Sequence, residues 1–191
     1  MIASILLAAA ATVASSADDE APRVEIATDR GTFVVALFAD RAPATVENFL
    51  RYVEDGFYDG TVFHRVIPGF MIQGGGFDES LAKKPTRAPI ENEADNGVAN
   101  RRGTLAMART GDPHSATAQF FVNLVDNAYL DHRGRDAQGW GYAVFGRVVA
   151  GMETVDAIAA VPTGTRAGMQ NVPLDPVVIE KARRVEPPPN A

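Results

Sequence analysis

Hydrophobic and polar residues alternate at the start of the predicted domain in the manner of a β-hairpin. Residues 23–28 (RVEIAT) have the pattern of a half-buried strand, with apolar side chains on one face. Residues 29–31 (DRG) are typical of a turn, and residues 32–38 (TFVVALF) return as the partner strand. The sequence therefore predicts that the domain opens with two antiparallel strands.

The hydrophobic period changes from two to that of a helix in the next segment. Four apolar residues are spaced at i, i+3, i+4 and i+7, namely Val46, Phe49, Leu50 and Val53. Pro43 suits a first turn, where its missing N–H costs nothing, and Glu47 near the start favours the helix dipole. Gly56 is the expected left-handed residue after the helix. These features predict a helix over residues 43–54 that buries one face.

The remaining pattern is mostly that of strands and loops. Further strands are predicted over residues 61–67, 70–73, 103–109, 119–124, 143–149 and 177–185, with a second helix over 152–160. Loops are predicted over residues 78–102, 110–118, 131–141 and 162–176. About eight short strands with turn signals are typical of a β-barrel or a β-sandwich. The pattern alone does not choose between these two architectures.

Composition and charge narrow the classes of function. The chain has 191 residues, of which 46% are hydrophobic and 22% charged, enough for one sizeable globular domain. Its net charge is -6 and no basic run exceeds two residues, which argues against nucleic-acid binding. Cysteine is absent, which removes disulfides, thiolate catalysis and cysteine-ligated zinc.

The first 17 residues have the pattern of a secretory signal. Residues 2–13 are almost entirely apolar, but this run is shorter than the roughly 20 residues that span a bilayer. Small residues follow at 14–17, so we expect cleavage after Ala17. No Lys or Arg precedes the apolar run, which departs from the usual pattern and indicates either a weak signal or a true start upstream. A membrane-anchored N-terminus is the alternative to a cleaved signal.

The chain is therefore expected to have four parts. These are a signal peptide (1–17), a short linker (18–21), a globular domain (22–186) and a proline-rich tail (187–191). We expect the mature domain to be a monomer with no stable membrane insertion.

Residues 63–77 (FHRVIPGFMIQGGGF) contain one charged side chain, Arg65, in an apolar run. Burying an unpaired charge is costly, so Arg65 either extends its charge to solvent from a core strand or points into an apolar pocket. The glycines at 74–76 lack the Gly-Lys-Ser/Thr and the helix of a phosphate-binding loop. They more simply allow the backbone to bend or a ligand to approach closely.

Other catalytic patterns have little support. His64, His114 and His132 form no metal-binding pair, although folding can still bring them together. No G-x-S-x-G motif is present, and the carboxylates Glu91 and Glu93 lie in a polar loop typical of a solvated face.

The run that begins at Phe63 resembles the F-H-R-x-I-P-G-F-M-x-Q-G-G signature of cyclophilin-type peptidyl-prolyl cis–trans isomerases. Gln119-Phe120-Phe121 is a second match, and the resemblance covers about residues 22–185. It implies a mainly β fold, a closed eight-stranded antiparallel barrel capped by two α-helices. It also implies an isomerase that needs no metal or cofactor and acts on proline-containing polypeptide segments.

Six residues match the active-site positions of the family: Arg65, Phe70, Met71, Gln73, Gln119 and Phe121. By resemblance, Arg65, Phe70 and Gln73 are the expected catalytic residues, and the others bind substrate.

The expected rim of the groove departs from the family pattern. The family has an Ala-Asn-Ala stretch where this chain has Ala108, Arg109 and Thr110. A groove tryptophan before Leu-Asp is replaced by Tyr129, which precedes Leu130, and a groove histidine is replaced by Tyr142. We therefore predict substrate contacts from Ala108, Arg109, Tyr129, Leu130 and Tyr142. The missing tryptophan puts tight cyclosporin binding in doubt, and Trp140 is expected to anchor a loop rather than replace it.

These observations lead to one main hypothesis and two alternatives. The main hypothesis is an isomerase that assists the folding of exported proteins and is itself periplasmic or secreted. The first alternative is a chaperone-like module that holds proline-containing segments without turnover. The second is a sugar or phosphate enzyme on a β-barrel, which only the glycines at 74–76 favour.

Overall fold

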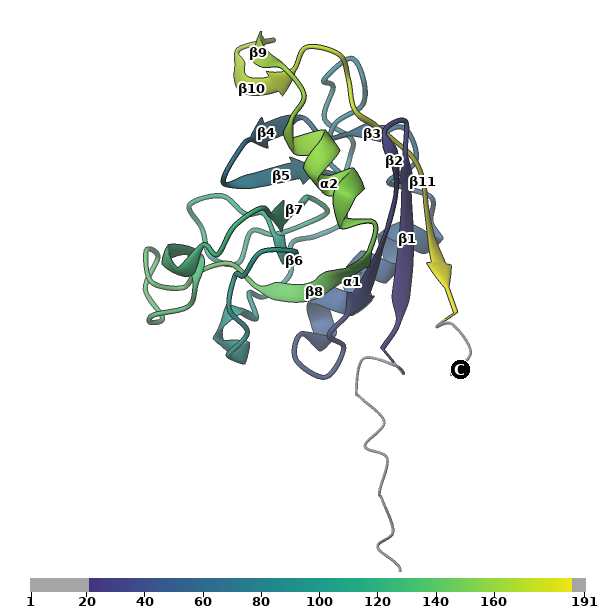
Figure 1. The fold of residues 1–191 in the computed structure, drawn as a ribbon. Coiled ribbons are helices and arrows are strands. Elements are labelled where there is room, and N and C mark those ends of the chain that lie inside the picture. The colour runs from purple at the N-terminus through teal and green to yellow at the C-terminus, as the bar shows by residue number, and fades with distance from the viewer. Residues whose placement is uncertain (1–20, 187–191) are drawn as a thin grey trace, which may run out of the picture.

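The computed structural model of the chain describes residues 21–186, which form a curled antiparallel sheet with two α-helices (Figure 1). The strands of the main sheet are β1 (Arg23–Thr28), β2 (Gly31–Leu37), β3 (Thr61–Val62), β4 (Arg65–Ile67), β5 (Met71–Gly74), β6 (Thr104–Met107), β7 (Phe120–Asn123), β8 (Val144–Ala150) and β11 (Val178–Val185). A separate hairpin contains β9 (Thr163–Arg166) and β10 (Met169–Pro173). The helices are α1 (Pro43–Glu54) and α2 (Met152–Ala159), with short 3₁₀ turns η1 (Ala94–Asn96) and η2 (Ala128–Leu130).

The main sheet has nine strands in the order β3-β11-β1-β2-β8-β6-β7-β5-β4. Its end strands, β3 and β4, follow each other in the chain, yet no ladder joins them in the described residues. The sheet is therefore a half-barrel. The predicted mainly β antiparallel fold with two helices is confirmed, but closure into a barrel of eight strands was an overstatement.

The strand predicted over residues 61–67 is interrupted because the chain changes partner within it. Thr61–Val62 pair with β11, whereas Arg65–Ile67 pair with β5. Between the two pieces, the Phe63 N–H donates to the Val177 carbonyl at 2.9 Å. One apolar run thus supplies both ends of the sheet, which hydrophobic periodicity does not reveal.

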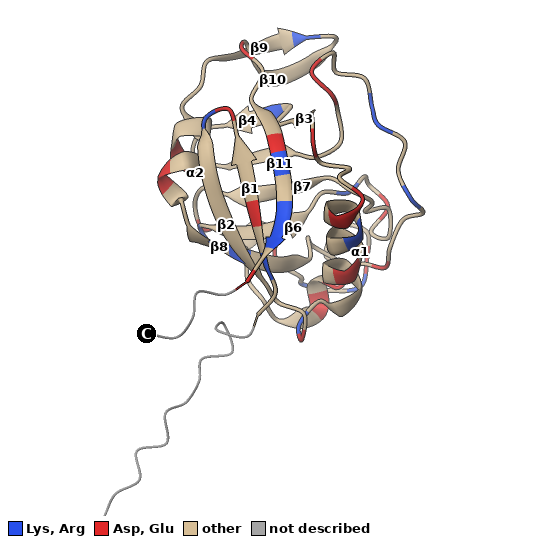
Figure 2. Ribbon diagram, turned by 90° about the vertical axis from the view of Figure 1, so that its right-hand side faces the viewer, with Lys and Arg blue, Asp and Glu red and all other residues tan. Residues whose placement is uncertain are grey.

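Helix α1 has the predicted bounds and the predicted buried face. Val46, Phe49 and Val53 are buried, and Pro43 lies in the first turn. Gly56 follows the helix with φ of 64°, a left-handed conformation that glycine adopts without the steric cost of a side chain. Figure 2 places α1 and α2 at opposite sides of the curled sheet.

The N-terminus of α1 is capped by a distant carboxylate rather than by Glu47, which lies beyond the first turn. The carboxylate of Glu93 accepts hydrogen bonds from the backbone N–H groups of Ala44 at 3.1 Å and Thr45 at 2.8 Å. It also accepts one from the Thr45 hydroxyl at 2.7 Å. A carboxylate here satisfies helix donors that have no partner within the helix and interacts favourably with the dipole. Glu93 is therefore structural rather than part of a solvated face.

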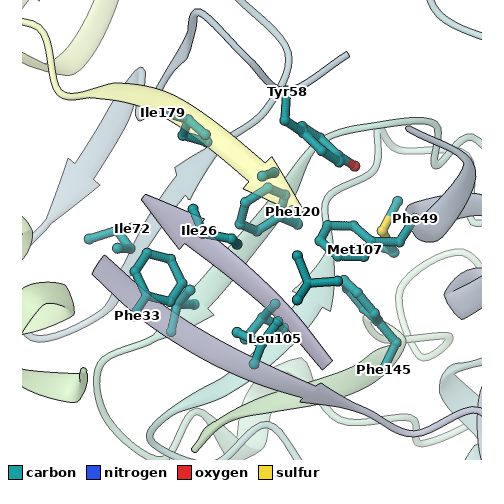
Figure 3. Close-up of a cluster of buried hydrophobic side chains, with 14 of the residues drawn as sticks. Ile26, Phe33, Phe49, Tyr58, Ile72, Leu105, Met107, Phe120, Phe145 and Ile179 are labelled. Atoms are coloured by element: carbon teal, nitrogen blue, oxygen red, sulfur yellow. The ribbon is translucent and has the colours of Figure 1, made fainter. Parts of the chain in front are cut away.

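An aromatic and aliphatic core fills the inside of the curled sheet (Figure 3). Phe49 from α1 lies 5.2 Å from Tyr58, 5.6 Å from Phe120 and 5.2 Å from Phe145, measured between ring centroids. Aromatic pairs at such separations add about 0.5–1.5 kcal/mol each beyond burial. The core thus fastens α1 to strands that are far apart in the sequence.

The hairpin β9–β10 lies in a segment predicted to be a loop. Its glycines and prolines are typical of loops, and the two strands are revealed only by the antiparallel backbone pairing of β9 with β10. The pairing is irregular between Met169 and Val172, and Asn171 has φ of 61°, which is uncommon for a residue other than glycine. The hairpin contacts β4, as Figure 1 shows. A segment near the C-terminus is thus placed beside the signature run.

Three basic residues, Lys181, Arg183 and Arg184, lie close together in β11, which Figure 2 shows as blue segments of the ribbon. Each of them pairs with a carboxylate from another element: Lys181 with Asp59 at 2.8 Å, Arg183 with Glu25 at 2.7 Å, and Arg184 with Glu54 at 3.0 Å. The charge of these residues is therefore largely neutralised by their neighbours.

The predicted signal peptide (1–17) and proline-rich tail (187–191) lie outside the described residues. Within residues 21–186, neither α1 nor α2 is long and apolar enough to cross a membrane.

Candidate active site

Three adjacent strands place three of the predicted site residues in one row. In the register of the sheet, Arg65 of β4 lies opposite Gln73 of β5, which lies opposite Phe121 of β7. Side chains of residues in register share a face of the sheet. Phe70 directly precedes β5 and joins the same apolar cluster as Phe121. Two segments about fifty residues apart in sequence thus form one site.

A chain of side-chain hydrogen bonds links the polar members of this row. The Arg65 guanidinium donates from Nη1 to Oε1 of Gln73 at 3.3 Å. The Gln73 amide in turn donates from Nε2 to Oε1 of Gln119 at 3.0 Å. All three side chains are half-buried, so each is held in place while remaining accessible. The arrangement fixes the direction of the Arg65 guanidinium.

An apolar pocket of about 100 Å³ lies next to Arg65. It is lined by Arg65, Phe70, Met71, Gln73, Ala108, Arg109, Phe121, Leu130 and Tyr142. Every one of these residues was predicted from the sequence to belong to the site. We call this cavity the apolar pocket, and its size suits one small ring rather than a large side chain.

The two predicted site residues that do not line the apolar pocket lie at its border. Gln119 is connected to it through Gln73, as described above. Tyr129 is 60% exposed and stacks on Phe70 with ring centroids 5.9 Å apart. Tyr129 therefore belongs to the rim of the apolar pocket and not to its floor.

The opposite rim is built around Arg109, at a position where this chain departs from the family pattern. The Arg109 Nε–H donates to the Gly141 carbonyl at 2.9 Å, and the guanidinium carbon lies 4.6 Å from the centroid of the Tyr142 ring. Tyr142 meets Phe121 edge to face at 5.7 Å. A cation over an aromatic ring is favourable, so these contacts hold the rim side chains as one unit.

Sequence reasoning missed a network of buried amides that supports the site. Asn127 donates from Nδ2 to the Phe70 carbonyl at 3.0 Å and to Oδ1 of Asn123 at 2.8 Å. Asn123 donates to Oδ1 of Asn100 at 3.2 Å. All three asparagines are buried. The sequence offered one sign of this network, because Asn123 lies inside a strongly apolar predicted strand and a buried amide requires hydrogen-bond partners.

The third glycine of the run at 74–76 makes room for a site residue. A β-carbon added at Gly76 would lie 2.4 Å from Cγ of Gln119, closer than atoms can approach. At Gly75, where φ is 78°, an added β-carbon would meet the ring of Tyr58 at 2.8 Å. The groups that approach these glycines closely are therefore side chains of the protein itself and not a ligand. The space beside these glycines is therefore filled, which leaves no room there for a phosphate.

Two of the three histidines flank the buried Trp140. The rings of His114 and His132 lie 4.8 Å and 5.6 Å from it. The indole N–H donates to the Asn92 carbonyl at 3.2 Å, so Trp140 anchors its loop, as expected. No group of three or more His, Asp or Glu side chains within residues 21–186 is arranged to hold a metal ion.

His64 is buried behind the signature strand, with 5% of its surface exposed. Its ring lies 4.6 Å from that of Phe77. The pKa of His64 is lowered from 6.5 to about 4, mainly by burial. A backbone hydrogen bond with Val62 acts in the opposite direction, and the positive charge of Arg65 lowers the pKa further. The ring is therefore neutral at pH 7. Among the described residues, nothing forms a hydrogen bond with its Nδ1.

Comparisons with known proteins agree with this arrangement. The sequence family described as "Cyclophilin type peptidyl-prolyl cis-trans isomerase/CLD" matches residues 23–184. The chain is 60% identical over 160 residues to peptidyl-prolyl cis-trans isomerase cyp18 of Streptomyces antibioticus, covering 84% of this chain and 96% of that protein. It is 59% identical over 154 residues to peptidyl-prolyl cis-trans isomerase B of Escherichia coli strain K12, covering 80% and 93%.

A solved structure extends the similarity to the fold. A crystal structure of a cyclophilin type peptidyl-prolyl cis-trans isomerase from Cryptosporidium parvum, in the presence of the dipeptide Ala-Pro, matches with a TM-score of 0.71 and 26% identity. The match covers 84% of this chain and 97% of that chain. The chain belongs to the family of cyclophilin-type peptidyl-prolyl cis–trans isomerases. The predicted family and enzyme class are confirmed, while the roles of individual residues stay predictions.

Proposed function

We propose that the protein accelerates rotation about X-Pro bonds in exported polypeptides and that Arg65 stabilises the twisted amide. The observation that carries the proposal is a guanidinium at the edge of a small apolar pocket, oriented by Gln73. A proline ring fits the apolar part, while the adjacent donor reaches the bond that rotates. The Ala-Pro dipeptide present with the related Cryptosporidium parvum protein supports a proline-containing substrate.

Rotation about the amide bond requires neither a nucleophile nor a proton transfer. Its barrier of about 18–20 kcal/mol is the loss of amide resonance. Uncatalysed exchange takes tens to hundreds of seconds, so turnover in milliseconds requires a reduction of roughly 6–7 kcal/mol. An active site therefore has to bind the twisted amide more strongly than either planar form.

Arg65 has the chemistry to make this distinction. In the twisted amide, the proline nitrogen regains a lone pair that the planar amide lacks. A guanidinium has five N–H donors, and within residues 21–186 one side-chain acceptor, Gln73, is found for it. A remaining donor directed at that nitrogen stabilises only the twisted state. Such a charge-assisted bond contributes about 1.5–3 kcal/mol.

The rest of the reduction comes from holding the substrate. Phe70, Met71 and Phe121 keep the proline ring in place, so that only the carbonyl side of the bond rotates. Gln73 and Gln119 offer amide groups at the border of the apolar pocket for the substrate backbone.

The proposal is tested by NMR exchange spectroscopy on a short Ala-Pro peptide. Arg65→Ala should lower kcat/KM by about ten- to a hundredfold, the equivalent of one charge-assisted hydrogen bond. Arg51→Ala, an exposed arginine on α1, is the matched control and should retain the wild-type rate. A wild-type rate in Arg65→Ala would refute the mechanism.

Peptide affinity separates an isomerase from the chaperone-like alternative. If Arg65 acts on the twisted amide, Arg65→Ala should bind the peptide about as tightly as wild type while losing turnover. Calorimetric titration with the same peptide measures this affinity. Loss of affinity in proportion to turnover would instead favour a role of Arg65 in binding alone.

We further infer that the protein acts outside the cytoplasm, on exported clients. This inference is supported by the signal-like pattern of residues 1–17. The test is N-terminal sequencing of the protein recovered from cell fractions after expression of the full chain. A mature protein that begins at Asp18 in the periplasm or medium is expected. A cytoplasmic protein that retains residues 1–17 would rule out export.

A further inference from the structure

A second hollow, of about 500 Å³, borders the signature strand on β4. It is lined by His64, Arg65, Phe77, Gln119, Met169, Gln170 and Asn171. We call it the hairpin hollow, because three of these side chains come from β10. Arg65 lines both the apolar pocket and the hairpin hollow, so the two cavities are adjacent at the proposed catalytic group.

His64, one of the residues that line the hairpin hollow, has a buried ring nitrogen without a hydrogen-bond partner in residues 21–186. Nδ1 of His64 has no hydrogen bond within the described part of the chain, and the side chain is only 5% exposed. Leaving such an atom unsatisfied costs about 1–3 kcal/mol. Buried polar groups in proteins are nearly always paired, so this exception in a residue that lines a cavity marks the wall of the hairpin hollow as unusual.

The part of the hairpin hollow that β10 contributes has an unusual backbone. The β9–β10 ladder is irregular between Met169 and Val172, and Asn171 between them has φ of 61°. A left-handed residue other than glycine is retained only where the surroundings require it, and such residues cluster at binding sites. Here the irregularity brings Met169, Gln170 and Asn171 to one cavity. Figure 1 shows this hairpin beside β4.

We propose that the hairpin hollow is a subsite for a client residue that flanks the proline, and that it favours a hydroxyl or amide side chain. The proposal rests on the isomerase function proposed above. We assign its occupant to the same polypeptide, because Arg65 lines both cavities and a chain whose proline fills one has its neighbouring residues within reach of the other.

The chemistry of the hairpin hollow explains the preference. Gln119, Gln170 and Asn171 each offer an amide that both donates and accepts hydrogen bonds. The imidazole of His64 adds a polar ring to the same wall. Arg65 is the one charged residue among those lining the hollow, so a lysine or arginine of the client is disfavoured.

The test compares peptides in which one residue within two positions of the proline, on either side, is Ala, Ser, Asn or Lys. Wild type should show a higher kcat/KM for Ser or Asn than for Lys at one of these positions, by about fivefold or more, as one hydrogen bond provides. Gln170→Ala and His64→Phe should each reduce this ratio toward one. Thr165→Ala, exposed on the same hairpin and outside the lining of the hollow, should preserve it.

Two outcomes separate the subsite from the function on which it rests. Failure of wild type to accelerate exchange in the all-alanine peptide overturns the isomerase function. Normal acceleration with equal kcat/KM for every peptide overturns the subsite alone. A preference that persists in both Gln170→Ala and His64→Phe overturns it as well. Gln170 is exposed, so its replacement keeps the test valid even where the His64 variant fails to fold.

Discussion

The two faces of β5 and β7 are built from consecutive residues, yet one face is a packed core and the other borders an open pocket. Ile72 and Phe120 belong to the inner cluster, where both are fully buried. Their neighbours Met71 and Phe121 belong to the outer cluster and are almost as buried, at 2% and 4% exposure. Burial of individual residues therefore does not distinguish a core from a binding site.

What distinguishes the two faces is what lies beyond the side chains. Phe120 contacts the rings of Phe49, Tyr58 and Phe63. Phe121 borders a cavity of about 100 Å³ that also contains the Arg65 guanidinium. A core side chain has apolar neighbours on every side, whereas a pocket side chain faces space and a polar group. Mutations on the inner face should therefore affect mainly stability, and mutations on the outer face mainly activity.

Truncating the two adjacent phenylalanines should have opposite consequences. Phe120→Ala should destabilise the fold by about 3–5 kcal/mol, because it leaves a cavity among packed rings. Phe121→Ala should cost less stability, because it enlarges an existing pocket. It should instead lower kcat/KM about ten- to a hundredfold, as expected from losing contact with an apolar ring.

Urea unfolding and NMR exchange on an Ala-Pro peptide measure the two effects separately. The contrast between the faces is wrong if Phe121→Ala is as destabilised as Phe120→Ala while retaining full activity.

The neighbours His64 and Arg65 extend the contrast to β4. Because burial lowers the pKa of folded His64 to about 4, the unfolded chain binds its proton first as the pH falls below 6.5. The His64 contribution to stability is therefore intact above pH 6.5 and lost progressively down to about pH 4, a change of about 3 kcal/mol.

The measurement is the free energy of unfolding between pH 7 and pH 4, compared with a His64→Gln variant. As the pH falls from 6.5 to 4, wild type should lose more free energy of unfolding than His64→Gln. Gln138→Ala, which replaces an exposed loop residue that does not titrate, serves as the control and should follow the wild-type curve. Parallel curves for wild type and His64→Gln would show that His64 is not buried as a neutral ring.

The amides beneath the pocket should affect both faces. Asn127→Ala removes donors to the Phe70 carbonyl and to Asn123, so it should destabilise the protein by about 1–3 kcal/mol. It should also reduce isomerase activity, since Phe70 loses its support. Gln138→Ala, an exposed amide in a loop, should stay within about 0.5 kcal/mol of wild type by urea unfolding. An Asn127→Ala protein as stable and active as this control would contradict the role of the network.

The smallest effect is expected at the rim. Tyr129→Ala removes the exposed ring that stacks on Phe70, so kcat/KM on an Ala-Pro peptide should fall about two- to tenfold. Stability to urea should scarcely change, because the side chain is 60% exposed. Tyr129→Phe keeps the stacked ring and should be close to wild type. Equal losses in Tyr129→Ala and Tyr129→Phe would assign the effect to the hydroxyl and not to the stack.

Local pattern was sufficient for the elements whose buried face comes from nearby residues. The helix over 43–54 and the first hairpin were predicted because Val46, Phe49 and the alternating residues of β1 carry the period themselves. The fold of 163–173 was not predicted, because a hairpin rich in glycine and proline has no apolar period of its own. The cap of α1 by Glu93 was missed for a related reason, since it joins residues 48 positions apart.

The sequence by itself determined the chemical groups of the candidate site. A dense run of signature residues around Arg65, with a second match at Gln119 and Phe121, identified the family and the lining of the apolar pocket. Such side chains can be recognised without coordinates because the chemistry of the site depends on residue type and spacing.

Only the tertiary structure decided which face of each strand is core and which is pocket. All four residues of β7 are buried, so alternation along that strand has no polar side to orient it. A slip of one residue in the pairing with β5 would exchange Phe120 and Phe121 between the two faces. The observed register is set by contacts of the whole sheet, with Phe49, Tyr58 and Phe63 packing against Phe120 on the inside. The hairpin hollow likewise exists only because β10, a hundred residues beyond β4, folds back against it.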